Sequence, residues 1–262
     1  MTRIRCWQVD AFTNRPFGGN PAAVCWLEHE AEAAWMQTVA AEMNLSETAF
    51  VRKLDEGYEL RWFTPTLEVD LCGHATLASA HALWQAGIIP AGQIRFHTRS
   101  GVLTCVRNGD WIELDFPATQ AVAAEEPTIL STALGAQPML VAQSKFDYVA
   151  IYDSPALVRA MEPDFRALGT IPVRGVMVTA VSDDPNYDFI ARFFAPASGI
   201  DEDPVTGSAY CALLPYWSER LGKRELRAYQ ASKRGGELRL RLNGDRVVLG
   251  GQAVTIWQGE MV

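Results

Sequence analysis

Two long segments of this 262-residue chain contain no charged residue, and each is long enough to form a helix. They cover residues 74–85 and residues 204–218. A helix without a charged face has to be buried on all sides. Pro215 lies inside the second segment, so we expect that helix to kink or to restart there.

Most of the remaining chain is alternating or β-branched, which predicts many short strands. Asn-Gly-Asp triplets at residues 108–110 and 243–245 each separate two strand-like runs and predict hairpin turns. The amphipathic stretch 31–43 predicts a surface helix packed on one side. A chain made mostly of strands can bury an apolar helix by wrapping a curved sheet around it. We therefore predict an α+β fold with two similar lobes, each a β-barrel or strongly curved sheet around a central apolar helix.

The chain also repeats itself. Arg61-Trp-Phe-Thr-Pro65 resembles Arg192-Phe-Phe-Ala-Pro196, 131 positions later, and the two Asn-Gly-Asp triplets are 135 positions apart. With an offset of 131, Cys72 aligns with Asp203. An internal duplication explains both matches, and chance similarity of short strand motifs is the alternative. We predict one lobe over residues 1–118 and the other over 119–262, with the last strand, about 252–262, able to belong to either.

Composition excludes several classes of function. Lys plus Arg number 23 against 31 Asp plus Glu, a net charge of −8, which argues against nucleic-acid binding and against adhesion to anionic membranes. The first ten residues lack the apolar core of a signal peptide, and the uncharged stretch 71–94 is too polar and broken for a membrane span. The five cysteines form no Cys-x-x-Cys pair, so we expect no disulfide framework, no metal site and a cytoplasmic protein.

A first candidate site stands before the first uncharged segment, in Asp70-Leu-Cys-Gly-His-Ala-Thr76. Gly73 lets a ligand approach the backbone, and the free N–H groups of a first helical turn attract anions. Cys72, His74 and Thr76 stand at the same place and are candidates to contact that ligand. Without a function, Asp70 would be an N-cap, Cys72 a buried apolar residue and His74 a hydrogen-bonded core residue.

The second uncharged segment has its own cluster, Asp203-Pro-Val-Thr-Gly-Ser208, in the corresponding place. Helix N-termini in both lobes would favour a small carboxylate substrate. Here too, capping by Thr206 or Ser208 is the alternative explanation.

Glu47 starts an apolar strand and is flanked by the hydroxyls of Ser46 and Thr48. If it is partly buried, its raised pKa would suit it to carry a proton; the alternative is a glutamate facing solvent at a strand edge. A glycine-rich loop that ends at Asn20 lacks the pattern of a nucleotide-binding loop, but it is a further candidate to contact substrate.

Taken together, these motifs resemble the PhzF-like family, named after an isomerase of phenazine biosynthesis. The matching runs extend over almost the whole chain: Val9-Asp-Ala-Phe-Thr13, Phe17-Gly-Gly-Asn-Pro21, Ser46-Glu-Thr-Ala-Phe50, Phe63-Thr-Pro65, Asp70-Leu-Cys-Gly-His-Ala-Thr76 and Asp203-Pro-Val-Thr-Gly-Ser-Ala209. The resemblance implies the diaminopimelate epimerase-like fold, with the active site between the lobes, and it favours a homodimer.

The resemblance also implies cofactor-free chemistry in which a proton leaves one carbon of a small carboxylate and returns to another. Glu47 matches the proton carrier, and the other catalytic matches are His74, Asp203 and Ser208. The positions that bind the substrate carboxylate match Ser46, Gly73 and Gly207; we add Cys72, Thr76 and Asn20 as substrate contacts.

One departure from the pattern concerns specificity: Tyr210 stands where family members often carry histidine, and we expect it to change the shape of the pocket and the choice of substrate. Related epimerases and racemases use two cysteines, one before each helix, and here only Cys72 is present. An amino-acid epimerase that uses Cys72 and a non-catalytic carboxylate-binding protein are the alternative functions.

Overall fold

The two uncharged segments form the longest helices of the protein, α2 (Gly73–Gln85) and α6 (Gly207–Leu221). A computed structural model describes residues 3–90 and 92–262, so Met1 and Thr2 of the predicted first lobe lie outside the described residues. The chain divides into two compact units. Unit 1 comprises Met1–Phe116 and Val248–Val262, and unit 2 comprises Pro117–Val247.

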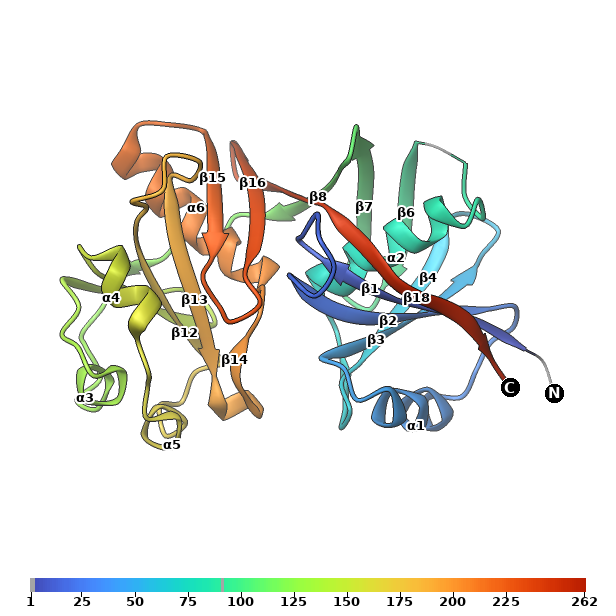
Figure 1. Ribbon diagram of the computed structural model, residues 1–262, viewed down its shortest axis with the longest axis horizontal. Helices are drawn as coiled ribbons and strands as arrows, with labels where there is room; N and C mark the ends of the chain where they lie inside the picture. Colours follow the sequence, from blue (N-terminus) through green and yellow to red (C-terminus); the bar gives the residue numbers. More distant parts are fainter. Residues whose placement is uncertain (1–2, 91) are drawn as a thin grey trace. The chain divides into compact units, whose positions relative to one another are not determined.

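Unit 1 is a curved, mixed sheet with two helices (Figure 1). Its further elements are β1 (Ile4–Ala11), β2 (Asn20–Leu27), α1 (Ala33–Met43), β3 (Glu47–Lys53), β4 (Tyr58–Phe63), β5 (Glu68–Val69), β6 (Gln93–Thr98), β7 (Gly101–Asn108), β8 (Trp111–Pro117) and β18 (Ala253–Met261). The strands pair in the order β18-β1-β2-β3-β4-β6-β7-β8, with the short β5 beside β4. Figure 1 shows the last strand, in red, beside the first, in blue. Residues 253–261 therefore belong to unit 1.

Unit 2 repeats this plan. Its elements are β9 (Val122–Ala123), α3 (Leu130–Leu134), β10 (Leu140–Gln143), β11 (Asp147–Ile151), α4 (Pro155–Ala160), α5 (Phe165–Leu168), β12 (Gly175–Val181), β13 (Phe189–Ala195), the 3-10 turn η1 (Pro196–Ser198), β14 (Ile200–Asp203), β15 (Glu225–Gln230) and β16 (Gly236–Asn243); β17 (Arg246–Gly251) crosses the boundary between the units.

The pairing pattern is the same in both units. From β1 to β7 in unit 1, successive pairs are antiparallel, parallel, antiparallel, parallel and antiparallel. The pairs from β10 to β16 follow the same sequence. A short strand, β5 or β14, lies beside the fourth strand and leads into the long helix. The predicted α+β class and the two pseudo-symmetric lobes are therefore confirmed.

Matching ion pairs mark the repeat at the level of side chains. Arg61 on β4 holds both carboxylate oxygens of Glu68 on β5, at 2.8 and 3.0 Å. Arg192 on β13 holds Glu202 on β14 in the same way, at 2.7 and 3.0 Å. Such bidentate pairs fix the planar guanidinium as well as the carboxylate. Each pair ties down the short strand that precedes the long helix.

The helix α2 is enclosed, as its composition predicts. Ten of its thirteen residues are buried, and it contacts β1, β2, β3 and β18. Its buried hydroxyls are satisfied within the helix, since Thr76 donates to the Cys72 carbonyl and Ser79 to the Ala75 carbonyl. The helix α1, by contrast, packs on β3 and β4 through one face, which confirms the predicted surface helix.

One expectation for the second helix was wrong. The helix begins at Gly207 rather than at residue 204, because residues 203–206 form a turn held by side-chain hydrogen bonds. The helix continues through Pro215, so of the two expected effects the restart does not occur. Pro215 has no N–H for the carbonyl of Cys211, and the backbone N–H of Thr119 donates to that carbonyl instead, at 2.9 Å. The orphaned acceptor is thus satisfied from outside the helix.

In the described part of the chain, no helix has both the length and the hydrophobicity needed to cross a membrane.

Candidate functional site

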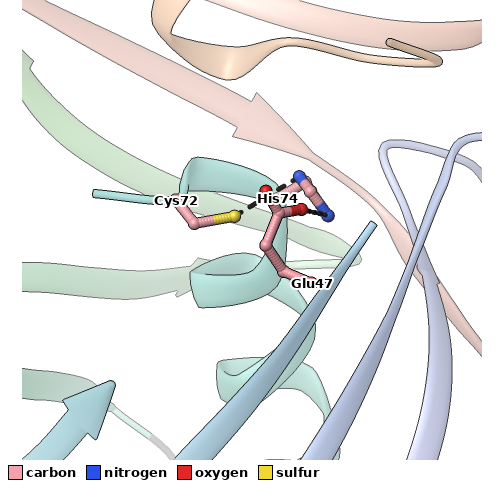
Figure 2. A group of neighbouring side chains, drawn as sticks. All are labelled: Glu47, Cys72 and His74. Carbon is pink, nitrogen blue, oxygen red and sulfur yellow. Dashed lines mark hydrogen bonds and ion pairs between the residues drawn. The ribbon is translucent and has the colours of Figure 1, made fainter. Parts of the chain in front are cut away.

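Three predicted residues meet in unit 1, where β3 begins and α2 begins (Figure 2). Glu47 is the first residue of β3, and Cys72 and His74 flank the start of α2. Glu47 Oε2 lies 3.1 Å from His74 Nε2, and Cys72 Sγ lies 3.5 Å from His74 Nδ1. The Glu47 side chain is only 14% exposed and that of His74 only 6%. Of the two alternatives for Glu47, the partly buried one is therefore confirmed.

The electrostatics of the cluster follow from its burial. Burial raises the pKa of the Cys72 thiol to about 11, and the nearby Glu47 carboxylate acts in the same direction. Burial alone would lower the pKa of His74, but Cys72 and Glu47 outweigh it and raise that pKa well above its usual value. Burial therefore keeps the Cys72 thiol protonated at neutral pH, next to the His74 imidazole and Glu47.

A second layer of polar groups orients His74. Asn20, fully buried at the start of β2, places its Nδ2 3.3 Å from His74 Nδ1, and its Oδ1 accepts a hydrogen bond of 3.3 Å from Ser46 Oγ. An amide Nδ2 can only donate, so this contact forms when His74 Nδ1 is unprotonated. With Nδ1 unprotonated, the neutral imidazole carries its proton on Nε2, the nitrogen that lies 3.1 Å from Glu47 Oε2.

The same three residues offer a set of metal ligands. One donor atom each from Glu47, Cys72 and His74 lie within 4.8 Å of one another. A metal ion would require the Cys72 thiolate and an unprotonated His74 nitrogen, and both pKa shifts oppose that state. Binding of a metal ion there would therefore release these protons.

A second group of predicted residues lies in unit 2, at the turn before α6. Thr206 is the N-cap residue, and its hydroxyl donates to Asp203 Oδ2 at 2.5 Å. Gln230 holds the turn from the other side: its Nε2 donates to the Asp203 carbonyl at 2.8 Å, and its Oε1 accepts from the Thr206 N–H at 3.0 Å. Gln230 is 1% exposed, so the bracing amide is part of the core.

Ser208, the second residue of α6, has a different partner. Its Oγ accepts a hydrogen bond of 2.8 Å from Arg174, whose guanidinium also binds both carboxylate oxygens of Asp147. Asp147 is 1% exposed. The hydroxyl of Ser208 is therefore held by an ion pair whose carboxylate is buried.

Capping explains neither helix start. Cys72 and Thr206 are the N-cap residues, and neither side chain makes a capping hydrogen bond. Asp70 forms an ion pair with Arg99 instead. The two N-caps are 134 positions apart, as are Gly73 and Gly207, the first residues of the helices. The expected match of Cys72 with Asp203 was wrong, because three further residues precede the second helix; the residue at the position of Cys72 is Thr206.

The remaining predicted contacts are placed as follows. Gly73 and Gly207 open their helices, and Ser46 directly precedes β3. Thr76 is fully buried, with its hydroxyl committed to the Cys72 carbonyl. Tyr210 is also fully buried, and its hydroxyl has no hydrogen-bond partner among the described residues. Burial, followed by the charge of Asp203, raises the pKa of that hydroxyl well above its usual value.

Sequence reasoning missed three residues of these networks: Asp147, Arg174 and Gln230. Each comes from a strand or loop between 22 and 61 positions away from Ser208 in the chain, and none belongs to a motif. Only the packing of unit 2 brings them to the start of α6.

Comparison with known proteins agrees with this architecture. A profile of the family described as "Phenazine biosynthesis-like protein" matches residues 9–259. A protein named "Uncharacterized isomerase" from Halalkalibacterium halodurans is 55% identical over 264 aligned positions, which cover 100% of both chains.

Solved structures show the same relationship. The crystal structure of a phenazine biosynthesis protein of the PhzF family from Enterococcus faecalis shares 40% identity with this chain and has a TM-score of 0.96, with 100% of both chains covered. A probable proline racemase from Agrobacterium radiobacter has a TM-score of 0.66 at 12% identity, over 99% of this chain and 93% of that one, which is a likeness in fold alone. The chain is therefore an isomerase that belongs to the phenazine biosynthesis-like (PhzC-PhzF) family.

Proposed function

We propose that this protein moves a proton between two carbon atoms of a small carboxylate substrate, without a cofactor, and that Glu47 carries the proton. The observation behind the proposal is the contact of 3.1 Å between Glu47 Oε2 and His74 Nε2 in a buried setting. A base must be ionised before it accepts a proton, and an N–H of His74 next to the carboxylate favours the ionised form.

The proton balance closes within the site. The Glu47 carboxylate takes a proton from one substrate carbon, and the electron pair left behind shifts the double bond. Glu47, now a carboxylic acid, returns a proton to the second carbon and is again a carboxylate. His74 keeps its Nε2 proton throughout and stabilises the negative charge that builds up during the transfer.

The proposal assigns further roles by resemblance to the family. Asp203 and Ser208 are proposed as additional polar groups of the same reaction, and Ser46, Gly73 and Gly207 as groups that bind the substrate carboxylate. A homodimer in the cytoplasm is proposed on the same basis, and light scattering of the purified protein tests the dimer.

An epimerase that uses Cys72 is the second candidate, because the thiol lies 3.5 Å from His74 Nδ1 at the start of a helix. With a pKa of about 11, however, this thiol can donate a proton but is a poor base at neutral pH. A two-thiol mechanism also needs a second cysteine before the other helix, and the residue there is Thr206. Both points favour Glu47 over Cys72 as the base.

Incorporation of solvent deuterium, followed by mass spectrometry, tests the proposal. The panel contains a dihydro-hydroxyanthranilate and several amino acids. Glu68→Gln is the matched control for Glu47→Gln, because Glu68 is 16% exposed and also ion-paired. We expect exchange into at least one compound, lost in Glu47→Gln by a factor of about 100 or more and kept in Glu68→Gln.

Other outcomes would point elsewhere. Equal loss in both variants would mean that Glu47 acts through stability. A compound that raises the melting temperature but never exchanges would support a binding protein instead.

A further inference from the structure

We propose that Arg174 is a positioning residue for the reaction: it directs the hydroxyl hydrogen of Ser208 away from the protein and toward the substrate carboxylate. The inference rests on the proposed function, which gives Ser208 its role. It adds a residue that no sequence motif contains.

The first step is the direction of one hydrogen bond. A guanidinium has five N–H donors and no acceptor, so in its contact of 2.8 Å with Ser208 it can only donate. Ser208 Oγ must then be the acceptor. Its own hydrogen cannot point at Arg174 and is left for another acceptor, such as a carboxylate oxygen.

The second step is that Arg174 itself has little freedom. Its Nε donates to Asp147 Oδ1 at 2.8 Å, and its second terminal nitrogen donates to Asp147 Oδ2. The rings of Phe146 and Phe193 each lie 5.4 Å from the guanidinium carbon, within the range of cation–π attraction. Salt bridge and rings together hold the guanidinium in one plane.

The backbone of Arg174 is fixed as well. Its N–H donates to the Phe146 carbonyl at 3.0 Å, and its carbonyl accepts from Ser198 Oγ at 3.0 Å. The next residue is Gly175, where a Cβ atom would lie 2.4 Å from the ring of Phe193. Glycine at this position therefore lets the Phe193 ring pack against the backbone and contact Arg174.

The degree of burial fits a positioning role. Asp147 is buried and balances the charge of Arg174, whereas the Arg174 side chain is 36% exposed. A purely structural ion pair in the core would bury both partners. This pair instead keeps its cationic end next to Ser208, in the first turn of α6.

The first test needs no substrate. In Ser208→Cys, the new thiol replaces the hydroxyl beside Arg174. Its pKa is obtained from the pH dependence of iodoacetamide labelling, after subtraction of the labelling of the native cysteines in the wild-type protein. We expect adding Arg174→Met to raise that pKa by about one unit or more, because an adjacent cation favours the thiolate. Arg174→Lys should give an intermediate value.

Two variants guard this test against misfolding and nonspecific effects. The combination of Arg174→Met with Asp147→Asn removes the uncompensated buried carboxylate and should still raise the thiol pKa, by less than Arg174→Met alone. Arg159→Met is the matched control: Arg159 is 38% exposed and holds both oxygens of Asp183, but does not contact Ser208. The proposal is overturned if Arg174→Met changes the thiol pKa no more than Arg159→Met does.

The second test is kinetic and uses the panel compound that exchanges fastest. Arg174→Met should lower kcat about 10- to 100-fold with little change in KM. A Ser208 hydroxyl that points in the wrong direction slows the reaction more than it weakens substrate binding. In a Ser208→Ala background the same change should cost almost nothing more, because both remove one interaction. Losses that multiply would overturn the proposal, since Arg174 would then act independently of Ser208.

The two tests separate the failure of this proposal from the failure of the proposed function. If no panel compound exchanges, the proposed function fails on that panel, and the thiol pKa still decides whether Arg174 acts on position 208. If the wild type is active but Ser208→Ala loses nothing, a positioning role through Ser208 is overturned while Glu47 remains the proton carrier.

Discussion

Glu47 Oε2 and His74 Nε2 lie 3.1 Å apart, although 27 positions of sequence separate the two residues. One stands at the start of a strand and the other in the first turn of an enclosed helix. Their contact brings a carboxylate and an imidazole together in a place that is almost closed to water.

The first prediction concerns the pKa of His74. Glu47→Gln removes a negative charge that raises this pKa, so we expect the pKa to fall toward its usual value in the variant. The measurement is an NMR titration of the imidazole C–H signals. Glu68→Gln should leave the His74 signals unchanged, and an unchanged pKa in Glu47→Gln would show that the two side chains do not interact.

The second prediction concerns the reactivity of Cys72. With a pKa of about 11, fewer than about one thiol in a thousand is ionised at pH 7.5. Iodoacetamide should therefore label Cys72 at least about 100-fold more slowly in the native protein than in urea. Glu47→Gln should speed up labelling, because the Glu47 charge contributes to the raised pKa. Peptide mass spectrometry measures both, and fast native labelling would contradict the account.

The third prediction is a dependence of stability on pH. Burial, and to a lesser degree Arg107, lowers the pKa of His81 to about 4, against 6.5 in the unfolded chain. The neutral form of His81 is favoured in the native state. Its contribution to the free energy of unfolding is therefore complete above pH 6.5 and is lost as the pH falls toward 4. His81→Gln should therefore lose less free energy of unfolding between pH 6.5 and pH 4, as measured by urea denaturation.

The contribution of His74 to the free energy of unfolding depends on pH in the opposite direction, so it does not interfere with the comparison of His81→Gln and wild type. Its pKa is raised in the native state, so its contribution is complete below pH 6.5 and is lost only as the pH rises toward the native value. A His81→Gln variant with the same pH dependence as the wild type would contradict the prediction for His81.

The fourth prediction concerns Gln230, whose amide holds the turn before α6. Gln230→Met keeps the approximate volume but leaves the Thr206 N–H and the Asp203 carbonyl without this buried partner. We expect the free energy of unfolding to fall by about 2–4 kcal/mol. Gln143→Met, at an exposed position on β10, is the control and should change it by less than about 0.5 kcal/mol. Equal values for the two variants would show that this amide carries no stability.

Much of the fold could be predicted from the sequence because its strongest signals are local. The absence of charge in two segments requires enclosed helices, and the repeated Arg-aromatic-Phe-x-Pro block marks equivalent strands, β4 and β13. The start of α6 and its passage through Pro215 could not be predicted in the same way. Both depend on tertiary partners, Gln230 in one case and the Thr119 N–H in the other.

Some residues of the candidate site could likewise be predicted from the sequence, and others could not. Glu47, Cys72 and His74 stand in recognisable motifs, and the structure brings them together. Arg174 and Asp147 are ordinary charged residues in the sequence. Their importance appears only when folding places an arginine next to two aromatic rings, a buried aspartate and Ser208.

The most direct test of the central claim compares solvent-deuterium incorporation in Glu47→Gln and Cys72→Ser, side by side, with the panel compound that the wild type exchanges fastest. If Glu47 carries the proton, Glu47→Gln loses exchange by a factor of about 100 or more, while Cys72→Ser retains it within about threefold. Loss of exchange in Cys72→Ser, with full exchange in Glu47→Gln, would contradict the account and identify the thiol as the proton carrier.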